Sequence, residues 1–276
     1  MIDLHTHTDE SDGSFAPHDL VESAASAGIG TLAITDHDTF GAYEKALPVA
    51  LKLSVRLIRG IELNTRHAGR SVHLLAYFVT RDPAPSFLAW LDNIVSSRRD
   101  RNRRLIEKLQ EFGLDIRLEE VEALGRTLTG RPHFARVLVA KGYAADREEA
   151  FSKYIGETGR AFVERDSPTL DETIALVAEA GGISSLAHPI RLGRRDLVEE
   201  EALIASFRDI GLPAIEAFHT DHTLADIKRY CEIASKYGFG ITGGSDFHGT
   251  YKSGVRLGHA VQGTLPIPDS VINALS

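Results

Sequence analysis

Short apolar runs alternate with amphipathic segments over the first 80 residues of the chain. Short apolar runs predict buried strands, and apolar positions three or four apart predict helices. The predicted strands are Ile2–Leu4, Thr31–Thr35, Val55–Leu63 and Ser71–Val79. The predicted helices are Pro17–Gly28 and Tyr43–Lys52, the first with proline at its start and glycine at its end. This βαβ order predicts largely parallel pairing with helices outside.

The pattern changes at Ser86, where apolar residues recur at helical spacing until Gly113 ends the run. Shorter predicted helices follow at Leu118–Leu124, His133–Lys141 and Arg147–Ile155. No strand is predicted between about residues 86 and 160. We therefore expect an all-helical insertion at 100–160 within an α/β domain made of residues 1–99 and 161–276.

Strands and helices alternate again in the last third of the chain. The predicted strands are Ala161–Glu164, Ile183–Ala187, Ala214–Phe218, Phe239–Thr242 and Leu257–Val261. The predicted helices are Leu170–Ala180, Glu199–Ile210 and Thr223–Tyr237. About seven strands in the α/β part are enough for a small, irregular barrel.

Composition and charge narrow the function. The 276 residues are 43% hydrophobic and carry a net charge of −8, which argues against stable binding to duplex nucleic acid or to an anionic membrane. No stretch has the roughly 18 apolar residues of a membrane span, and the N-terminus lacks the pattern of a signal peptide. The single cysteine, Cys231, excludes an intrachain disulfide. We expect a cytoplasmic protein without a membrane partner.

Side chains that could bind metal, none of them cysteine, lie at the ends of apolar runs throughout the chain. They are His5, His7, Asp12, His37, Glu62, His73, His188, Asp246 and His248. Strands that each deliver one or two ligands at their carboxyl ends build the multinuclear site of a barrel. The HxH spacing after the first strand and the DxH spacing after Phe239–Thr242, the last major strand, each place both ligands on one strand face.

Single residues of this set have other interpretations. Asp12 could cap a turn with Gly13, and Glu62 could pair with Arg59 or Arg66. His73 and His188 could each be core histidines. An aspartate on either side of His37 could accept a hydrogen bond from its imidazole N–H and fix the tautomer.

Ligation by nitrogen and oxygen suits Mn, Fe, Zn or Mg, and an imidazole-rich site favours the first three over Mg. Nine ligands are too many for one ion and sufficient for two or three that share Glu62. Such a cluster generates hydroxide near neutral pH and holds both oxygens of an in-line displacement.

Positive charge near these ligands would bind an anionic substrate. Arg191 follows His188 by three residues and is predicted to contact the reacting phosphoryl group. Arg131 and His133 are predicted to bind a second phosphate from the insertion, although Arg131 could form a helix-terminal salt bridge instead. His219, with His222 near it, could protonate the leaving group. We interpret the basic run at 98–104, and Arg194 and Arg195, as solvated.

The motifs DLHTHT, SDG, TDHD, GIE, AHP and GSDFH together resemble the polymerase and histidinol phosphatase (PHP) family. The resemblance implies a distorted, amidohydrolase-like (β/α)7 barrel that binds two or three metal ions. We expect these ions to be Mn. One ion would use His5, His7, Glu62 and Asp246; a second, Glu62, His73 and His188; a third, Asp12, His37 and His248.

The helical middle part resembles the insertion of the stand-alone bacterial phosphoesterases, which act on nucleoside 3′,5′-bisphosphates or short RNA. The resemblance therefore implies a hydrolase of ester bonds with a small phosphorylated substrate, a nucleotide or a short RNA. Our first hypothesis is hydrolysis of the 3′-phosphate of a nucleoside 3′,5′-bisphosphate by a metal-bridging hydroxide. The alternatives are 5′-3′ exoribonuclease activity and another phosphatase activity, such as histidinol phosphatase. C–N bond hydrolysis is disfavoured because no ligand strand carries a lysine.

Overall fold

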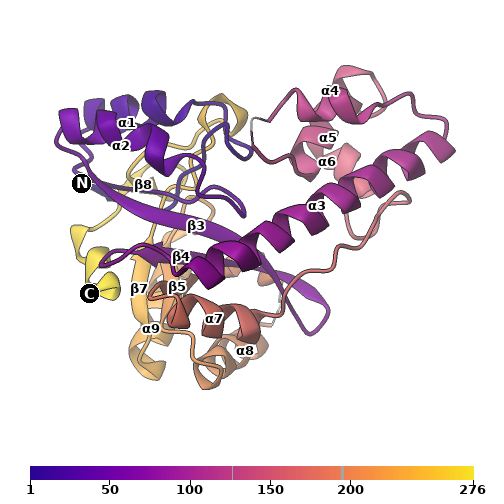
Figure 1. Ribbon diagram of the computed structural model, residues 1–276. Helices are drawn as coiled ribbons and strands as arrows, with labels where there is room; N and C mark the ends of the chain where they lie inside the picture. The colour runs from indigo at the N-terminus through magenta and orange to yellow at the C-terminus, as the bar shows by residue number, and fades with distance from the viewer. Residues whose placement is uncertain (126, 194–195) are drawn as a thin grey trace.

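A seven-stranded sheet, nearly closed into a barrel, forms the centre of the computed structural model, which describes residues 1–125, 127–193 and 196–276 (Figure 1). The strands pair in chain order: β1 (Ile2–Asp3), β2 (Thr31–Ile34), β3 (Arg56–His67), β4 (Arg70–Phe78), β5 (Ile183–Leu186), β6 (Ala214–Phe218) and β7 (Gly240–Gly243). The expected seven-stranded α/β barrel is thereby confirmed.

The two edges of the sheet meet beyond β1 and β7. The Leu4 N–H donates to the Gly243 carbonyl at 3.2 Å, and Thr6 forms a parallel bridge with Phe247. Gly244 permits this approach, because a Cβ atom there would lie 2.1 Å from the Cβ of His5. The meeting point brings the first and last ligand motifs of the chain together.

The prediction of largely parallel pairing is wrong for the middle of the sheet. β3 and β4 form a long antiparallel hairpin, and β4 also pairs antiparallel with β5. Ala68 and Gly69 make the turn, both with positive φ, as a two-residue hairpin turn requires. With no helix between β3 and β4, the chain returns directly along the sheet.

Two other predicted strands differ in the structure. Residues 161–164 form no strand; Ala161 and Val163 are apolar because they are buried in the core of the insertion. The segment Leu257–Val261 contributes only β8 (His259–Ala260), which pairs with β9 (Leu265–Pro266) in a separate two-stranded sheet.

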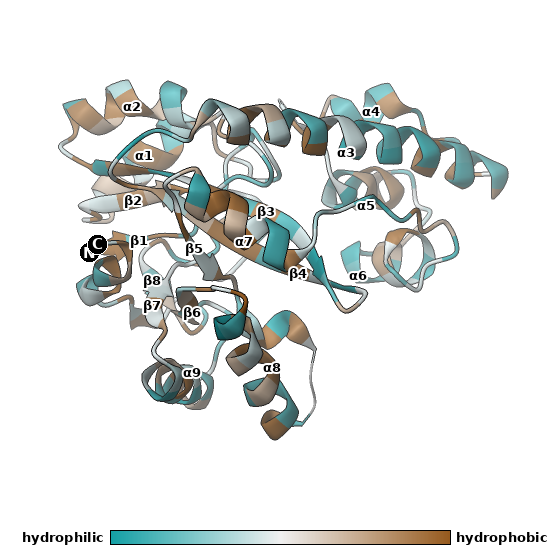
Figure 2. Cartoon of the chain, turned by 60° about the horizontal axis from the view of Figure 1, so that its bottom comes forward, coloured by the Kyte–Doolittle hydropathy of each residue, from teal (hydrophilic) through white to brown (hydrophobic). Residues whose placement is uncertain are grey.

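Helices cover the outer surface of the barrel (Figures 1 and 2). They are α1 (Pro17–Ser26), α2 (Tyr43–Lys52), α7 (Leu170–Glu179), α8 (Leu197–Asp209) and α9 (Leu224–Tyr237). Short turns of helix are η2 (Pro189–Leu192), η3 (Gly249–Tyr251) and η4 (Asp269–Leu275). No helix in the described ranges is long and apolar enough to cross a membrane.

The helical insertion begins with α3 (Pro85–Glu111), which runs from the barrel into a separate group of helices (Figure 1). That group contains α4 (Leu118–Glu122), α5 (Arg131–Ala140), α6 (Arg147–Ala150) and the π-helical turn η1 (Phe151–Ile155). Leu109, Phe134 and Leu138 are completely buried in a core of its own. The division at residues 100–160 stays a prediction.

Candidate active site

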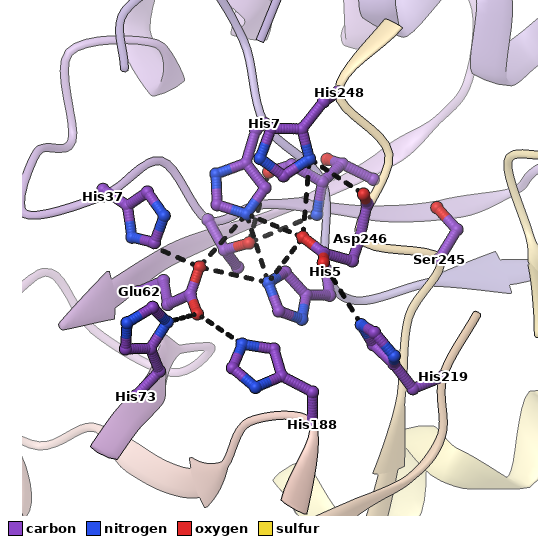
Figure 3. Close-up of polar contacts among 12 residues, drawn as sticks. His5, His7, His37, Glu62, His73, His188, His219, Ser245, Asp246 and His248 are labelled. Carbon is purple, nitrogen blue, oxygen red and sulfur yellow. Dashed lines mark hydrogen bonds and ion pairs between the residues drawn. The ribbon is translucent and has the colours of Figure 1, made fainter. Parts of the chain in front are cut away.

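Glu62 lies at the centre of the predicted ligands (Figure 3). Its Oε2 atom is 3.1–3.3 Å from nitrogen atoms of His5, His7 and His37. Its Oε1 atom is 2.7 Å from His73 Nδ1 and 3.0 Å from His188 Nε2. One carboxylate therefore joins five imidazoles from different parts of the chain.

Asp246 and Asp12 connect the remaining ligands. Asp246 Oδ1 lies 3.3 Å from His7 Nε2 and 3.5 Å from His248 Nδ1. Asp12 Oδ1 lies 3.3 Å from His248 Nε2, and Asp12 Oδ2 lies 3.8 Å from His37 Nε2. The structure thus brings all nine predicted side chains into one cluster.

The placement of these ligands on the strands differs partly from the prediction. His5 and His7 follow β1, His188 follows β5, and Asp246 follows β7, as expected for carboxyl ends. Glu62, however, lies inside β3, where it pairs with Leu75 across the hairpin. His73 is also inside β4. The hairpin carries its ligands along its length because both strands extend past the barrel.

The donor set fits divalent cations. Several groups of three ligand atoms lie within 4.8 Å of one another, among them one from His5, His7 and Glu62. The Nε2 atoms of His5 and His7 are only 3.1 Å apart, and His7 Nδ1 is buried without a hydrogen bond. Imidazole and carboxylate without thiolate is the ligand chemistry of Mn, Fe and Zn sites.

The carboxylates of the cluster stay ionised, whereas its histidines differ in protonation. Burial opposes the charge of Glu62, but His37 and His73 hold the pKa of its carboxyl well below its usual range. Burial lowers the pKa of His37 to about 4 and that of His188 well below its usual value. Burial also opposes the protonation of His7, but Asp246 and Glu62 raise its pKa to about 10. A bound cation would displace that proton.

The aspartates on either side of His37 do not fix its tautomer. Asp36 accepts from Thr8 and Ser11, and Asp38 accepts from Arg98 and from Arg165 at 3.0 Å. The backbone around Asp38 turns with φ at 52°, which directs its side chain away from the imidazole and toward the insertion.

Glu216 is a part of this site that the sequence analysis missed. It is fully buried on β6 and accepts from His5 Nδ1 at 2.9 Å and from the His188 N–H at 2.7 Å. The signal available in the sequence was a carboxylate in the middle of the apolar run Ala214–Phe218, where a charge needs a partner.

Arg191 lies beside the ligands, as predicted, and so does Lys252, which the sequence analysis missed. Arg191 Nη2 and Lys252 Nζ lie 2.9 and 2.8 Å from Asp246 Oδ2. His219 Nε2 is 3.3 Å from the same oxygen, while His219 Nδ1 accepts from the Asp221 N–H at 3.0 Å. His219 is therefore held against Asp246 and not against the cavity. Arg194 and Arg195 lie outside the described residues.

A cavity of about 650 Å³ joins the ligand cluster to the insertion. The predicted substrate residues Arg131 and His133 line it, with Arg98, Arg101 and Arg165. The interpretation of the run at 98–104 as solvated is wrong for Arg98 and Arg101, which are 7% and 6% exposed. Both continue the buried face of α3 at helical spacing from Ile94.

These arginines carry more positive charge than their protein partners neutralise. Among the described residues, Asp38 pairs with both Arg98 and Arg165, and no carboxylate lies within ion-pair distance of Arg101 or Arg131. Burial and the neighbouring Arg98 and Arg131 hold the pKa of Arg101 well below its usual range. Its Nε atom is buried without a hydrogen bond. The cavity therefore has a strongly favourable place for an anion.

Comparison with known proteins agrees with this geometry. The PHP domain family matches residues 3–167. A solved metal-dependent phosphoesterase from Bifidobacterium adolescentis is 30% identical, with a TM-score of 0.85 over 99% of this chain and 94% of that one. An amidohydrolase from Chromobacterium violaceum, solved with bound sulfate and no metal, is 27% identical, with a TM-score of 0.84 over 100% and 97%.

Three curated relatives have related activities. A 3′,5′-nucleoside bisphosphate phosphatase of C. violaceum is 30% identical over 94% of this chain and 90% of its own. The 5′-3′ exoribonuclease Rnm of Salmonella typhimurium is 32% identical over 90% and 85%. A phosphoribosyl 1,2-cyclic phosphate 1,2-diphosphodiesterase of Eggerthella lenta is 32% identical over 90% and 94%.

Fold, ligand cluster and relatives together define a metal-dependent phosphoesterase, a hydrolase that acts on ester bonds. The chain belongs to the PHP family.

Proposed function

We propose that this enzyme hydrolyses a phosphomonoester of a small molecule that carries a second phosphate, with the 3′-phosphate of a nucleoside 3′,5′-bisphosphate as the best candidate. One observation supports the choice most strongly. The cavity that joins the ligand cluster to the insertion is also lined by Arg98, Arg101, Arg131 and Arg165, and among the described residues only Arg98 and Arg165 of these four form ion pairs, both with Asp38. A cluster of this kind suits a second phosphate at a distance from the reacting one.

The nine ligands would hold two or three divalent ions, which we propose to be Mn²⁺ because imidazole-rich sites disfavour Mg²⁺. When bound, such ions supply a nucleophile from water at neutral pH and neutralise charge on the phosphoryl oxygens. Glu62 would be shared between ions, since each of its oxygens faces a different set of imidazoles.

Side chains beside the ligands would act on the substrate directly. We propose that Arg191 and Lys252, both in contact with Asp246 and both lining the cavity, bind the reacting phosphoryl group and stabilise charge in the transition state.

The leaving oxygen needs a proton. His219, the donor that the sequence suggests, is fully buried behind Asp246. We propose that His219 orients Asp246, and that Lys252 or water is the direct donor.

Arg131 and His133 would bind the second phosphate together with Arg98, Arg101 and Arg165. A charge-assisted contact contributes about 1.5–3 kcal/mol, so Arg101→Ala should raise KM for adenosine 3′,5′-bisphosphate at least about tenfold. It should change KM for adenosine 3′-monophosphate much less. Arg131→Ala should show the same difference.

Arg103→Ala is the matched control, because Arg103 lies on the same helix, is exposed and pairs with Asp100. Equal changes for the two substrates in Arg101→Ala and Arg131→Ala would remove these arginines from the second-phosphate site and would contradict the proposal.

A short RNA with a 5′-phosphate is the second candidate substrate. Arg66 and Arg147 line the same cavity in addition to Arg98, Arg101, Arg131 and Arg165. This positive charge is sufficient to bind more than two phosphates. A substrate panel separates the two: adenosine 3′,5′-bisphosphate, a 5′-phosphorylated trinucleotide, histidinol phosphate and phosphoribosyl 1,2-cyclic phosphate. If kcat/KM is highest for the trinucleotide, the enzyme is an exoribonuclease and not a nucleoside bisphosphate phosphatase.

A further inference from the structure

Glu216 connects two candidate metal ligands that come from different strands. Its Oε1 atom is 2.9 Å from His5 Nδ1, and its Oε2 atom is 2.7 Å from the backbone N–H of His188. The carboxylate lies on β6, between β5 and β7 in the sheet, and has no exposed surface. A single side chain thus reaches the loop after β1 and the loop after β5.

The partners of Glu216 are unusual for a buried carboxylate. Among the described residues the structure gives it no lysine or arginine, and an isolated buried charge is strongly unfavourable. His188 also needs support, because its backbone has φ at 28°, a region that L-residues rarely adopt. An observed outlier of this kind at a cluster of ligands is typical of functional sites.

We propose that Glu216 is a positioning residue of the metal centre, which keeps the proton of His5 on Nδ1 and holds His188 in its strained conformation. An ionised carboxylate can only accept hydrogen bonds, so His5 Nδ1 must donate to it. His5 Nε2 is then the free nitrogen, 3.2 Å from Glu62 Oε2 and 3.1 Å from His7 Nε2. A cation bound to His5 would in turn compensate the charge of Glu216 through the imidazole.

Replacement of Glu216 by glutamine tests this arrangement without changing its shape. The His188 N–H cannot reverse, so the amide oxygen must face it, and the amide NH₂ must then face His5 Nδ1. The NH₂ group only donates, so the His5 proton moves to Nε2. That nitrogen can then no longer bind a cation.

The experiment measures the binding of Zn²⁺ to metal-free protein by competition with a chromogenic chelator, without any phosphate substrate. Glu216→Gln should weaken the binding of at least one Zn²⁺ by about 10- to 100-fold, the usual effect of losing such a partner. Glu216→Asp keeps the charge but is too short to reach both partners, and it should lie between glutamine and wild type. Side-chain ¹⁵N spectra of the Zn²⁺-loaded wild type should show His5 protonated at Nδ1.

Glu200→Gln is the matched control. Glu200 is equally buried, at 1% exposed, but it pairs with Arg229 between α8 and α9, away from the ligands. It should lower the melting temperature and leave Zn²⁺ affinity unchanged. Unchanged Zn²⁺ affinity in folded Glu216→Gln, or in Glu216→Asp if the glutamine variant does not fold, would overturn the proposal.

This inference rests on the proposed metal centre and is independent of the substrate. If the wild type bound no Zn²⁺, the metal centre itself would be wrong. If it bound Zn²⁺ and did not hydrolyse adenosine 3′,5′-bisphosphate, only the substrate would be wrong.

Discussion

At the scale of single residues, two carboxylates organise the site. Glu62 contacts five imidazoles, and Asp246 Oδ2 accepts from Arg191 and Lys252 while its Oδ1 faces His7 and His248. Each of these acids is therefore shared between several partners. Asp12, at the edge of the cluster, contacts His248 and His37 at longer distances.

Glu62, at the centre of the cluster, and Asp12, at its edge, should respond differently to mutation. Glu62→Gln should abolish activity, because every ion that shares this ligand loses its anchor. Asp12→Ala should retain measurable activity and lose at most one ion. Metal content by mass spectrometry and phosphate release measured on the same samples check both statements, and equal residual activity in the two variants would exclude a bridging role for Glu62.

His222 should make stability depend on pH. Burial lowers its pKa to about 4, whereas a histidine in an unfolded chain titrates near about 6.5. The unfolded state binds the proton first as the pH falls, so this contribution is complete above about pH 6.5 and is lost between there and about pH 4. At about 1.4 kcal/mol per pH unit, the loss from pH 6.5 to 5 is about 2 kcal/mol.

The variant His222→Asn removes this titration. An asparagine amide can still donate to the Ala217 carbonyl, the partner of His222 Nδ1. Urea unfolding of metal-free protein between pH 5 and 7 should therefore give a flatter curve of unfolding free energy for the variant. Curves of the same slope would show that His222 does not titrate as the structure implies.

The sequence predicted individual ligands better than their supporting residues. A histidine or a carboxylate at the end of an apolar run can be recognised in the sequence, and all nine such residues converge. The apolar run around Glu216 indicates that its carboxylate needs a partner, but not that this partner is His5, 211 residues away. Lys252 follows Asp246 by six residues in a loop, where no strand or helix period indicates that the two side chains meet. The prediction that Arg98 and Arg101 are solvated is wrong because a run of basic residues is usually exposed, whereas these two lie on the buried face of α3.

At the scale of elements, the closure of the barrel depends on one close approach. Gly244 lies against His5, where β7 meets the end of β1, and the Asp246 N–H donates to the His5 carbonyl at 2.8 Å. Pattern and period predicted these strands. They could not predict the β3–β4 hairpin, because pairing direction depends on the Ala68–Gly69 turn and not on the apolar pattern.

Gly244→Ala should separate the two edges of the sheet. A Cβ there would meet backbone and Cβ atoms of His5 at 2.1–2.7 Å, and overpacking of this kind costs about 1–3 kcal/mol or more. Metal binding should fall together with the unfolding free energy. Gly30→Ala is the control, since nothing lies within 4 Å of a Cβ at that exposed position. Wild-type stability and metal binding in Gly244→Ala would contradict the description of the closure.

At the scale of the whole molecule, the barrel and the helical insertion enclose one cavity from two sides. The barrel provides the ligand cluster with Arg191 and Lys252, and the insertion provides Arg101 and Arg131. Glu10 connects the two parts, since its side chain contacts Lys45 at 2.6 Å and accepts from Thr127. Under the proposed function, the barrel would carry out the reaction and the insertion would select the substrate.

The central claim is that the nine-ligand cluster is a metal centre that hydrolyses phosphomonoesters. The most direct measurement is phosphate release from adenosine 3′,5′-bisphosphate by protein stripped with a chelator and then titrated with Mn²⁺, in ¹⁸O-labelled water. We expect no release without metal and recovery at two or three Mn²⁺ per chain. One ¹⁸O should enter the phosphate directly, and Glu62→Gln should show no recovery. Full activity in the metal-free protein, or a trapped phosphorylated enzyme, would contradict the account.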